Sequence, residues 1–245
     1  MDLKFATQCI YGKKEKFEKE LTGTISFPIY QTATYAHPEV GKSTGFDYSR
    51  LQNPTREQLE KVVATLEKGI DALAFSSGMA AITAFMEIFK PGDHLITDAD
   101  LYGGSIRFFD HINEKNGLTF DHINCSKEDV ESYIKPNTKA IFIETPTNPM
   151  MSVVDIRKIA AIAKKHNLLL IVDNTFMSII IFALPFSYFS ASFIISRFIP
   201  CIAEQIHKFS SCNAIPVIRS NIIAVRQTVI FILLLGNHQI CHYRL

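Results

Sequence analysis

The pattern of hydrophobic and polar positions predicts alternating strands and helices over the first 178 or so residues. Leu168 to Asp173 (LLLIVD) is a run of apolar residues that ends in an acid, which is typical of a strand covered on both faces by helices. Lys139 to Glu144 (KAIFIE) has the same pattern. Between them, Asp155 to Asn167 has apolar residues at helical spacing and cations in its last turn, which predicts a helix. These three segments predict a βαβ unit with both acids at one edge of a parallel sheet.

The remaining elements continue the alternation. Helices are predicted at Thr55–Lys68, from the Ser76-Ser77-Gly78 turn to Phe89, from Gly104 to about Asn116, and at Lys127–Ile134; strands are predicted at Ala72–Phe75, His94–Thr97 and Leu118–Ile123. The expected fold is therefore an α/β domain with a mostly parallel sheet flanked by helices. Open sheets of this kind bind ligands at the carboxyl ends of their strands, where Asp173 falls. A salt-bridged loop aspartate is the alternative reading of Asp173.

Two loops have the composition of anion sites. The Ser76-Ser77-Gly78 turn precedes a helical pattern, and the free N–H groups of such a turn can bind an anion, although most such turns only cap a helix. The loop from Gly41 to Arg56 carries Tyr48 and Arg50. Such a pair is often only an exposed part of the surface, but it can also bind a phosphate. Neither GxGxxG nor GxxxxGK[ST] is present, which argues against a nicotinamide dehydrogenase and a P-loop protein.

Charge and cysteine content narrow the class of protein. The 25 basic residues nearly balance the 24 acidic ones, so nothing indicates a nucleic-acid partner. The first residues lack the apolar core of a signal peptide, and the five cysteines are widely spaced without a CxxC pair. We expect a cytoplasmic protein with reduced thiols and no structural metal.

Composition changes abruptly near Met177. The 69 residues from Met177 to Leu245 contain one acid, Glu204, five cations and one glycine, Gly236. Ile, Phe and Ser dominate this tail, and no clear turn or helix-cap signal divides it. The tail is therefore not expected to continue the domain that precedes it.

Five motifs, in order, resemble the Cys/Met-metabolism family of pyridoxal-phosphate enzymes. They are YSRxxNPT (Tyr48 to Thr55), SSGMAAI (Ser76 to Ile82), LYGG (Leu101 to Gly104), ETPTNP (Glu144 to Pro149) and VDNTF (Val172 to Phe176). The family includes cystathionine γ-synthase, cystathionine γ- and β-lyases, methionine γ-lyase and O-acylhomoserine sulfhydrylases. The resemblance spans roughly residues 3–178 and implies the large domain of a fold-type-I pyridoxal-phosphate enzyme.

The resemblance also implies roles for individual residues. Asp173 would pair with the pyridine nitrogen of pyridoxal 5'-phosphate, and Tyr102 would stack on its ring. The phosphate would lie at the turn formed by Ser77, Gly78 and Met79. Tyr48 and Arg50 would reach the phosphate of a neighbouring subunit. Asn148 would lie near the ring hydroxyl, with Glu144 beside Asn148. Thr175 would lie beside the cofactor. No metal is implied.

The resemblance implies an enzyme of trans-sulfuration that eliminates or replaces a group at the γ- or β-carbon of a homoserine or cysteine derivative. Its substrate would be a small amino acid, and its assembly a homo-oligomer, a dimer of dimers, with no membrane or nucleic-acid partner. We divide the chain into an N-terminal arm (1–45), a partial cofactor-binding large domain (46–178) and a non-homologous tail (179–245). The motifs do not choose between synthase, lyase and sulfhydrylase.

The Schiff-base lysine of the family is not found in the tail. Where it is expected, about two dozen residues after Asp173, the sequence has Arg197, whose guanidinium stays protonated and cannot act as an amine nucleophile. Lys208 lies about ten residues after the expected position and is not flanked by the family's motif, so we predict that it has no catalytic role. The family's C-terminal domain is missing as well. We therefore expect no catalytic residue and an inactive chain.

Three interpretations of the tail and of the chain remain open. The tail reads most simply as a frameshifted translation beginning near residue 179. Alternatively, the uncharged stretch from Asn174 to Ser196 has the length of a bilayer-spanning helix, although Pro185 and several serines weaken that interpretation. In either case the chain could be a non-catalytic remnant that associates with an intact homologous subunit.

Overall fold

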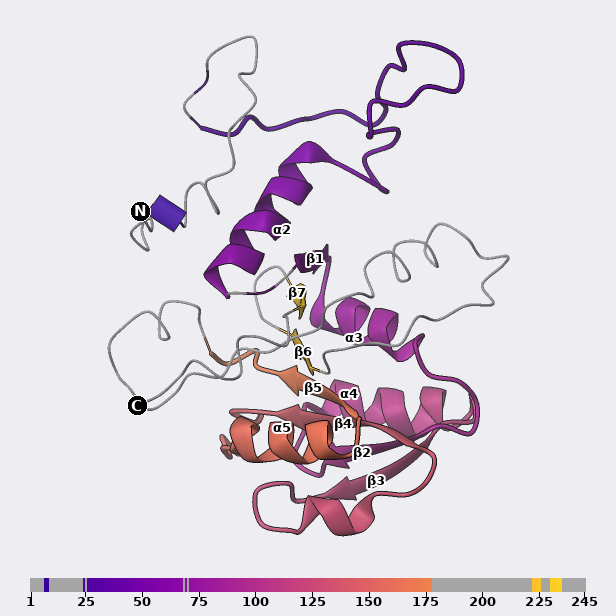
Figure 1. The fold of residues 1–245 in the computed structure, drawn as a ribbon, viewed down its shortest axis with the longest axis vertical. Helices are drawn as coiled ribbons and strands as arrows, with labels where there is room; N and C mark the ends of the chain where they lie inside the picture. The colour runs from indigo at the N-terminus through magenta and orange to yellow at the C-terminus, as the bar shows by residue number, and fades with distance from the viewer. Residues whose placement is uncertain are drawn as a thin grey trace.

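The computed structural model describes residues 7–8, 24, 26–67, 69, 71–177, 222–225 and 230–234. Its centre is a seven-stranded sheet with the order β1-β7-β6-β5-β4-β2-β3, covered by helices on both faces (Figure 1). The strands are β1 (Asp71–Phe75), β2 (His94–Asp98), β3 (Thr119–Ile123), β4 (Thr138–Glu144), β5 (Leu169–Asp173), β6 (Ile222–Val225) and β7 (Ile230–Leu234). The predicted α/β architecture is confirmed.

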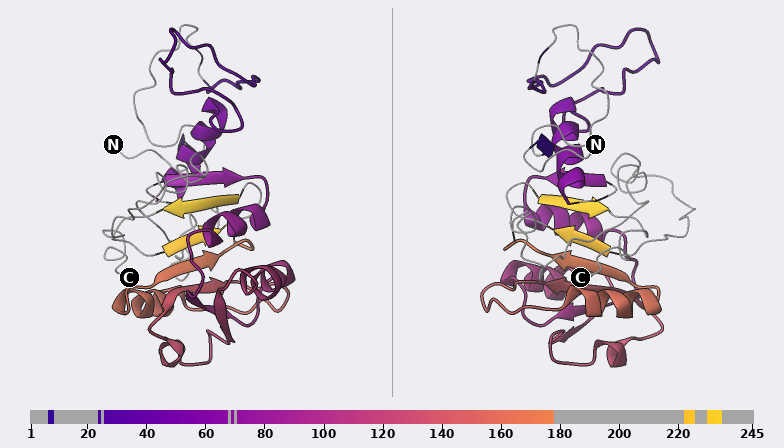
Figure 2. Two further views of the ribbon diagram at one scale, coloured as in Figure 1. Left: turned by 90° about the vertical axis from the view of Figure 1, so that its right-hand side faces the viewer. Right: turned by 60° about the vertical axis from the view of Figure 1, so that its left-hand side comes forward.

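The sheet is mostly parallel. The ladders β3–β2, β2–β4, β4–β5 and β5–β6 are all parallel, whereas β7 runs antiparallel to both of its neighbours, β6 and β1. Figure 2 shows the two tail strands lying between β5 and β1. The sequence analysis found no clear turn or helix-cap signal in the tail and predicted no element there, so it missed β6 and β7.

The helices follow the predicted positions with some changes. They are α2 (Pro54–Leu66), α3 (Gly78–Met86), α4 (Gly103–Phe108), the π-helical turn η1 (Phe109–Asn113), the 3-10 turn η2 (Val130–Tyr133) and α5 (Ile156–Lys165). Asn53, Ser77 and Asp155 accept hydrogen bonds from the first turns of α2, α3 and α5, which satisfies N–H groups that lack an intrahelical acceptor. The α-helix predicted at Lys127–Ile134 is a single 3-10 turn instead.

Alternate residues of the central strands pack against opposite faces of the sheet. On one face, Leu95, Phe142 and Ile171 pack against α3 and η1, where Phe85 and Phe109 lie. Phe142 stacks on Phe85 and meets Phe109 edge-on, with centroid distances of 5.9 and 5.2 Å. The period of two residues in a strand produces this division, and it explains why the central strands read as continuous apolar runs.

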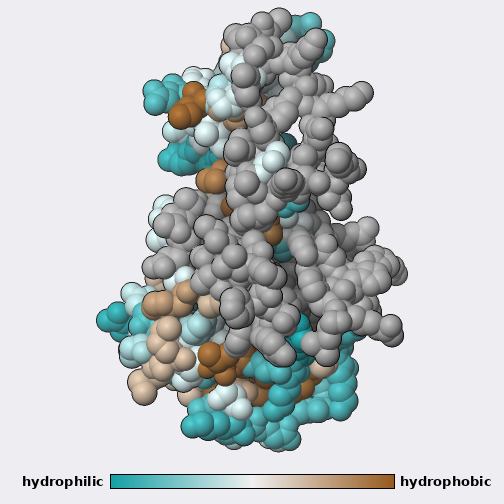
Figure 3. All heavy atoms as spheres, turned by 90° about the vertical axis from the view of Figure 1, so that its left-hand side faces the viewer, coloured by the Kyte–Doolittle hydropathy of each residue, from teal (hydrophilic) through white to brown (hydrophobic). Residues whose placement is uncertain are grey.

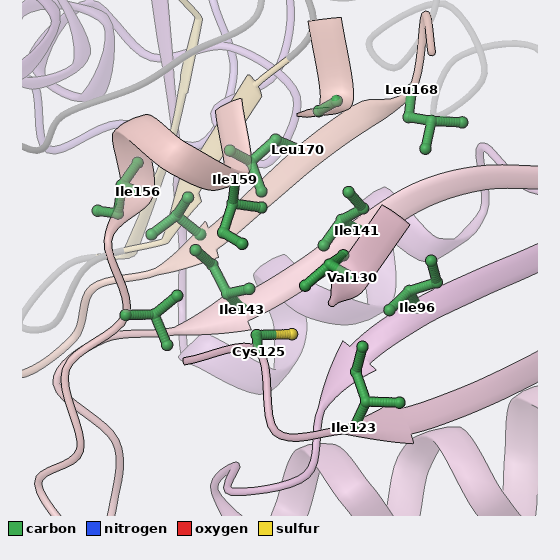
Figure 4. Close-up of a cluster of buried hydrophobic side chains, with 13 residues drawn as sticks. Ile96, Ile123, Cys125, Val130, Ile141, Ile143, Ile156, Ile159, Leu168 and Leu170 are labelled. Carbon is green, nitrogen blue, oxygen red and sulfur yellow. The ribbon is translucent and has the colours of Figure 1, made fainter. Parts of the chain in front are cut away.

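The second face of the sheet has its own core (Figure 4). There, Ile96, Ile141, Ile143 and Leu170 pack against Ile156 and Ile159 of α5 and against Val130 of η2. The βαβ unit β4-α5-β5 predicted from the sequence is confirmed, because α5 covers this face and the two strands are adjacent and parallel.

Residues 26–53 form an extended segment beyond α2, away from the sheet (Figures 1 and 2). Among these residues the only β-type pairings are the isolated bridges Thr34–Tyr48 and Glu39–Lys42. At the opposite end of the molecule, where α5 and β3 lie, Figure 3 shows mainly hydrophilic residues with smaller apolar patches between them. Across the part of the chain that is described, no helix has the length and apolar character needed to cross a bilayer.

Candidate functional site

Three neighbouring parallel strands end in carboxylates at one edge of the sheet. β2 ends at Asp98, β4 at Glu144 and β5 at Asp173. Glu144 and Asp173 are paired in the β4–β5 ladder, so the prediction that these two acids share an edge is confirmed. Asp98 was missed because the strand was expected to end at Thr97. The signal was weaker than in β4 and β5, because the polar Thr97 separates Asp98 from the apolar Leu95 and Ile96.

Asp173 is a buried carboxylate with one occupied oxygen. Its Oδ1 accepts hydrogen bonds from the hydroxyl and the N–H of Thr175, at 2.6 and 3.0 Å. Burial raises the pKa of Asp173, and the two hydrogen bonds from Thr175 oppose that increase. Within the described residues, Oδ2 of Asp173 accepts no hydrogen bond. It is therefore available to a ligand at the carboxyl edge.

Glu144 connects two separate segments through both of its carboxylate oxygens. Oε2 accepts the N–H of Tyr102 at 2.7 Å, and Oε1 accepts the N–H of Asn148 at 2.8 Å. Its side chain is buried, and burial raises its pKa to about 7, with a further contribution from the charge of Asp173. The carboxylate thus joins the residue before α4 to the loop that follows β4.

Tyr102 presents its ring at the same edge of the sheet. The residue is 46% exposed and immediately precedes α4. Its ring lies against Gly104, because a Cβ added at Gly104 would be 2.4 Å from Cε1 of Tyr102. Only a glycine leaves room for this position of the ring. The side chain predicted to stack on a cofactor is therefore partly exposed and rests against the second glycine of the LYGG motif.

The N-terminus of α3 has the geometry expected of an anion site. Ser77 caps the helix by accepting the N–H of Ala80 at 3.1 Å, and its carbonyl accepts the N–H of Ala81. Gly78 and Met79 occupy the first two helical positions, where N–H groups have no intrahelical acceptor. These N–H groups and the helix dipole favour a negatively charged ligand.

The loop after β4 is attached to the edge of the sheet by several hydrogen bonds. The hydroxyl of Thr147 donates to Asp100 at 2.5 Å, and the side-chain amide of Asn174 donates to the carbonyl of Thr145. The peptide bonds before Pro146 and Pro149 are both cis. Asn148, a predicted site residue, lies in this loop beside Glu144. The loop therefore has a defined position relative to Asp173.

Tyr48 and Arg50 lie apart from these residues. Both belong to residues 26–53, the segment that extends beyond α2 (Figure 1), and the guanidinium of Arg50 lies over the ring of Tyr48, 5.0 Å from its centroid. Arg50 is exposed. The structure therefore does not bring this pair to the carboxyl edge of its own sheet.

No lysine in the described residues forms a hydrogen bond or ion pair with Asp173, Glu144 or Tyr102. On the side of β5 away from β4 lies β6, whose Val225 is paired with Asp173. Arg197 and Lys208, discussed above as occupants of the lysine position, lie outside the described residues. The uncharged stretch considered as a membrane span is also outside them beyond Met177.

Comparison with known proteins agrees with this geometry. The family model for Cys/Met metabolism PLP-dependent enzymes matches residues 6–188. A cystathionine gamma-synthase/O-acetylhomoserine (thiol)-lyase of Bacillus subtilis is 57% identical over 158 residues, which are 64% of this chain and 42% of the relative. A cystathionine gamma-lyase of the same organism is 49% identical over 175 residues, covering 71% of this chain and 46% of the relative. The chain spans about half the length of the curated relatives it matches.

Solved structures show the same relationship. The crystal structure of cystathionine gamma-lyase from Lactobacillus plantarum complexed with L-serine superposes with a TM-score of 0.71 at 32% identity, covering 96% of this chain and 55% of that one. The crystal structure of metB from Corynebacterium glutamicum gives a TM-score of 0.67 at 39% identity, over 72% of this chain and 46% of that one. This chain belongs to the Cys/Met metabolism family of PLP-dependent enzymes, as its motifs predicted.

Proposed function

We propose that the carboxyl edge of this sheet binds pyridoxal 5'-phosphate. The observation that supports this most strongly is the combination of a buried Asp173, whose Oδ2 accepts no bond from the described residues, with the accessible ring of Tyr102 at the same edge. When bound, the cofactor supplies an electron sink through its protonated pyridine ring. Asp173 would hold that proton on the ring nitrogen, because a carboxylate favours the charged form of a neighbouring base.

The other site residues would hold and orient the cofactor. The N–H groups of Gly78 and Met79, at the end of α3 capped by Ser77, would bind the phosphate. Tyr102 would cover one face of the ring, and Thr175 would keep Asp173 oriented through its two hydrogen bonds. Asn148 would lie near the ring hydroxyl, in the loop that Glu144 anchors.

Tyr48 and Arg50 would bind the phosphate of a neighbouring subunit. They belong to residues 26–53, and the position of this segment beyond α2, away from the sheet, supports this role (Figure 2). Arg50 is suited to it because a guanidinium can contact a phosphate with two parallel hydrogen bonds. The proposal implies a homo-oligomer; we further propose, from the resemblance to the family, that it is a dimer of dimers in the cytoplasm.

The activity we propose for the intact enzyme is elimination or replacement at the γ- or β-carbon of a homoserine or cysteine derivative. This chain itself would not complete that reaction, because its sequence has no Ser-x-Thr-Lys stretch after Asp173 and carries Arg197 where the Schiff-base lysine is expected. Borohydride reduction in the presence of pyridoxal phosphate, followed by peptide mapping, tests this point. We expect no stoichiometric label on any one lysine; a single stoichiometric label would contradict the proposal.

We also propose that residues 179–245 are a shifted-frame translation. The motivation is the joint loss of acids, glycines and family motifs after Met177. Sequencing the gene across codons 174–182 and translating all three frames downstream provides the test. If a one-base correction restores a Ser-x-Thr-Lys motif, the intact product is a full-length enzyme; if no frame restores it, the proposal is wrong.

A second candidate function is association with an intact homologous subunit. Residues 26–53, which carry Tyr48 and Arg50, favour it, because this segment extends beyond α2, away from the sheet that carries Asp173 (Figure 1). Co-expression with an intact homologue followed by size exclusion tests the idea. Co-elution that is lost on Arg50→Ala would support it, and separate elution would exclude it.

A further inference from the structure

One buried carboxylate holds together the two segments that border the Asp173 edge. Glu144 accepts the N–H of Tyr102 on Oε2 at 2.7 Å and the N–H of Asn148 on Oε1 at 2.8 Å. Tyr102 lies 42 residues before Glu144 in the chain, and Asn148 four residues after it. The side chain is only 2% exposed, so water does not substitute readily for either bond.

We propose that Glu144 is a positioning residue, whose two oxygens fix the ring of Tyr102 and the loop of Asn148 relative to Asp173. This inference rests on the proposed binding of pyridoxal phosphate at that edge. It assigns Glu144 no contact with the cofactor, because both of its oxygens are already occupied by backbone donors.

The chemistry of the two bonds requires a carboxylate. Above its pKa of about 7, Glu144 is ionised and presents two acceptor oxygens, whereas the amide of glutamine presents one acceptor oxygen and one donor group at any pH. In Glu144→Gln, either the N–H of Tyr102 or that of Asn148 would therefore face an NH₂ group. A buried N–H without an acceptor is unfavourable, so one of the two segments should move away.

A second contact links the same regions but does not replace Glu144. The hydroxyl of Thr147 donates to Asp100 at 2.5 Å, which holds the loop near the end of β2. Neither Tyr102 nor Asn148 takes part in that hydrogen bond. Glu144 is thus the described residue that joins the backbone of the stacking aromatic to the backbone of Asn148.

Glu128 offers a control for the chemical change itself. Its Oε1 accepts the N–H of Asn124 and its Oε2 the hydroxyl of Tyr133, each at 2.7 Å. Like Glu144 it accepts two hydrogen bonds, but it is only partly buried, its partners are near in sequence, and it lies in the loop between β3 and η2. Glu128→Gln makes the same chemical change outside the proposed site.

The experiment uses the full 245-residue chain and pyridoxine 5'-phosphate, which has no aldehyde and cannot attach to surface lysines. Binding is followed by ring fluorescence and by the induced circular dichroism of the ligand, which reports its orientation. We expect Glu144→Gln to weaken binding by about tenfold and to reduce the dichroism at saturation. Glu128→Gln should leave both unchanged.

Amide hydrogen exchange of the ligand-free chain gives an independent readout. Peptides containing Tyr102 or Asn148 should exchange faster in Glu144→Gln and not in Glu128→Gln. Unchanged exchange and unchanged affinity in Glu144→Gln would overturn the inference, as would faster exchange with unchanged affinity and dichroism. If the wild-type chain does not bind the ligand, the proposed function itself is wrong, which is a distinct result.

Discussion

The ring of Tyr102 rests against Gly104 so closely that a Cβ on Gly104 would lie 2.4 Å from Cε1 of the ring. At Gly103, in contrast, an added Cβ would meet nothing within 4 Å. The two adjacent glycines of the LYGG motif therefore differ in function. Gly104 sets the position of the aromatic ring, and Gly103 is sterically free.

This difference predicts that only one of two alanine substitutions affects binding. Gly104→Ala should displace the ring and weaken binding of pyridoxine 5'-phosphate by about three- to tenfold, the contribution of an aromatic contact. The fold should remain intact, because the half-exposed ring can rotate outward. Gly103→Ala, the control, should keep the affinity. Equal affinities in the two variants, measured by fluorescence titration, would refute the assignment.

Asp173→Asn should separate binding from stability. The amide oxygen can still accept both hydrogen bonds from Thr175, while the negative charge that favours a protonated ring is lost. Affinity for pyridoxine 5'-phosphate should fall roughly 10- to 100-fold, the range of a charge-assisted hydrogen bond.

The unfolding midpoint in urea should not decrease in Asp173→Asn, because burial raises the pKa of Asp173 and the ionised form is thus disfavoured in the fold. Asp155→Asn, at the cap of α5, serves as the control with unchanged affinity. A parallel loss of affinity and stability in Asp173→Asn would indicate a structural role only.

Much of this site could be predicted from the sequence because it depends on local patterns. The strand, helix, strand pattern around Glu144 and Asp173 fixed their common edge, and Ser77 followed by Gly78 indicated a capped helix. The contact of Tyr102 with Gly104 depends on the orientation of a ring, which no sequence pattern specifies. The bridging role of Glu144 likewise depends on two backbone N–H groups whose positions appear only in the folded chain.

The arrangement of the tail could not be predicted for a different reason. β6 and β7 are separated from β5 by a long segment without turn signals, and their order across the sheet depends on long-range pairing. Asp98 was missed only because the predicted end of β2 stopped one residue early.

The raised pKa of Asp98 predicts that the stability of the fold depends on pH. Burial raises its pKa from 3.8 to about 6, so between these values the folded chain binds more protons than the unfolded chain. Stability should therefore fall as pH rises through this window and level off above it. Asp98→Asn cannot ionise and still accepts the N–H of Asp100.

The variant Asp98→Asn should match the wild type near pH 4 and exceed it by about 2–3 kcal/mol at pH 8. Urea unfolding at several pH values measures the difference. A constant difference across this range would contradict the raised pKa of Asp98.

The two tail strands predict a specific sensitivity to proline. Ala224 is paired with Val172 of β5 on one side and with Leu233 of β7 on the other. Ala224→Pro removes a ladder N–H inside the sheet, which should destabilise the chain by about 3 kcal/mol or more and promote aggregation through exposed strand edges. Ala224→Ser keeps the N–H and should remain soluble. Equal solubility and equal urea midpoints would contradict the position of β6 in the sheet.

The most direct test of cofactor binding at this edge is an equilibrium titration of the purified 245-residue chain with pyridoxine 5'-phosphate, alongside Asp173→Asn and Asp155→Asn. We expect saturable binding with one ligand per chain, strongly weakened in Asp173→Asn and unchanged in Asp155→Asn. No saturable binding, or equal binding by all three chains, would contradict this expectation.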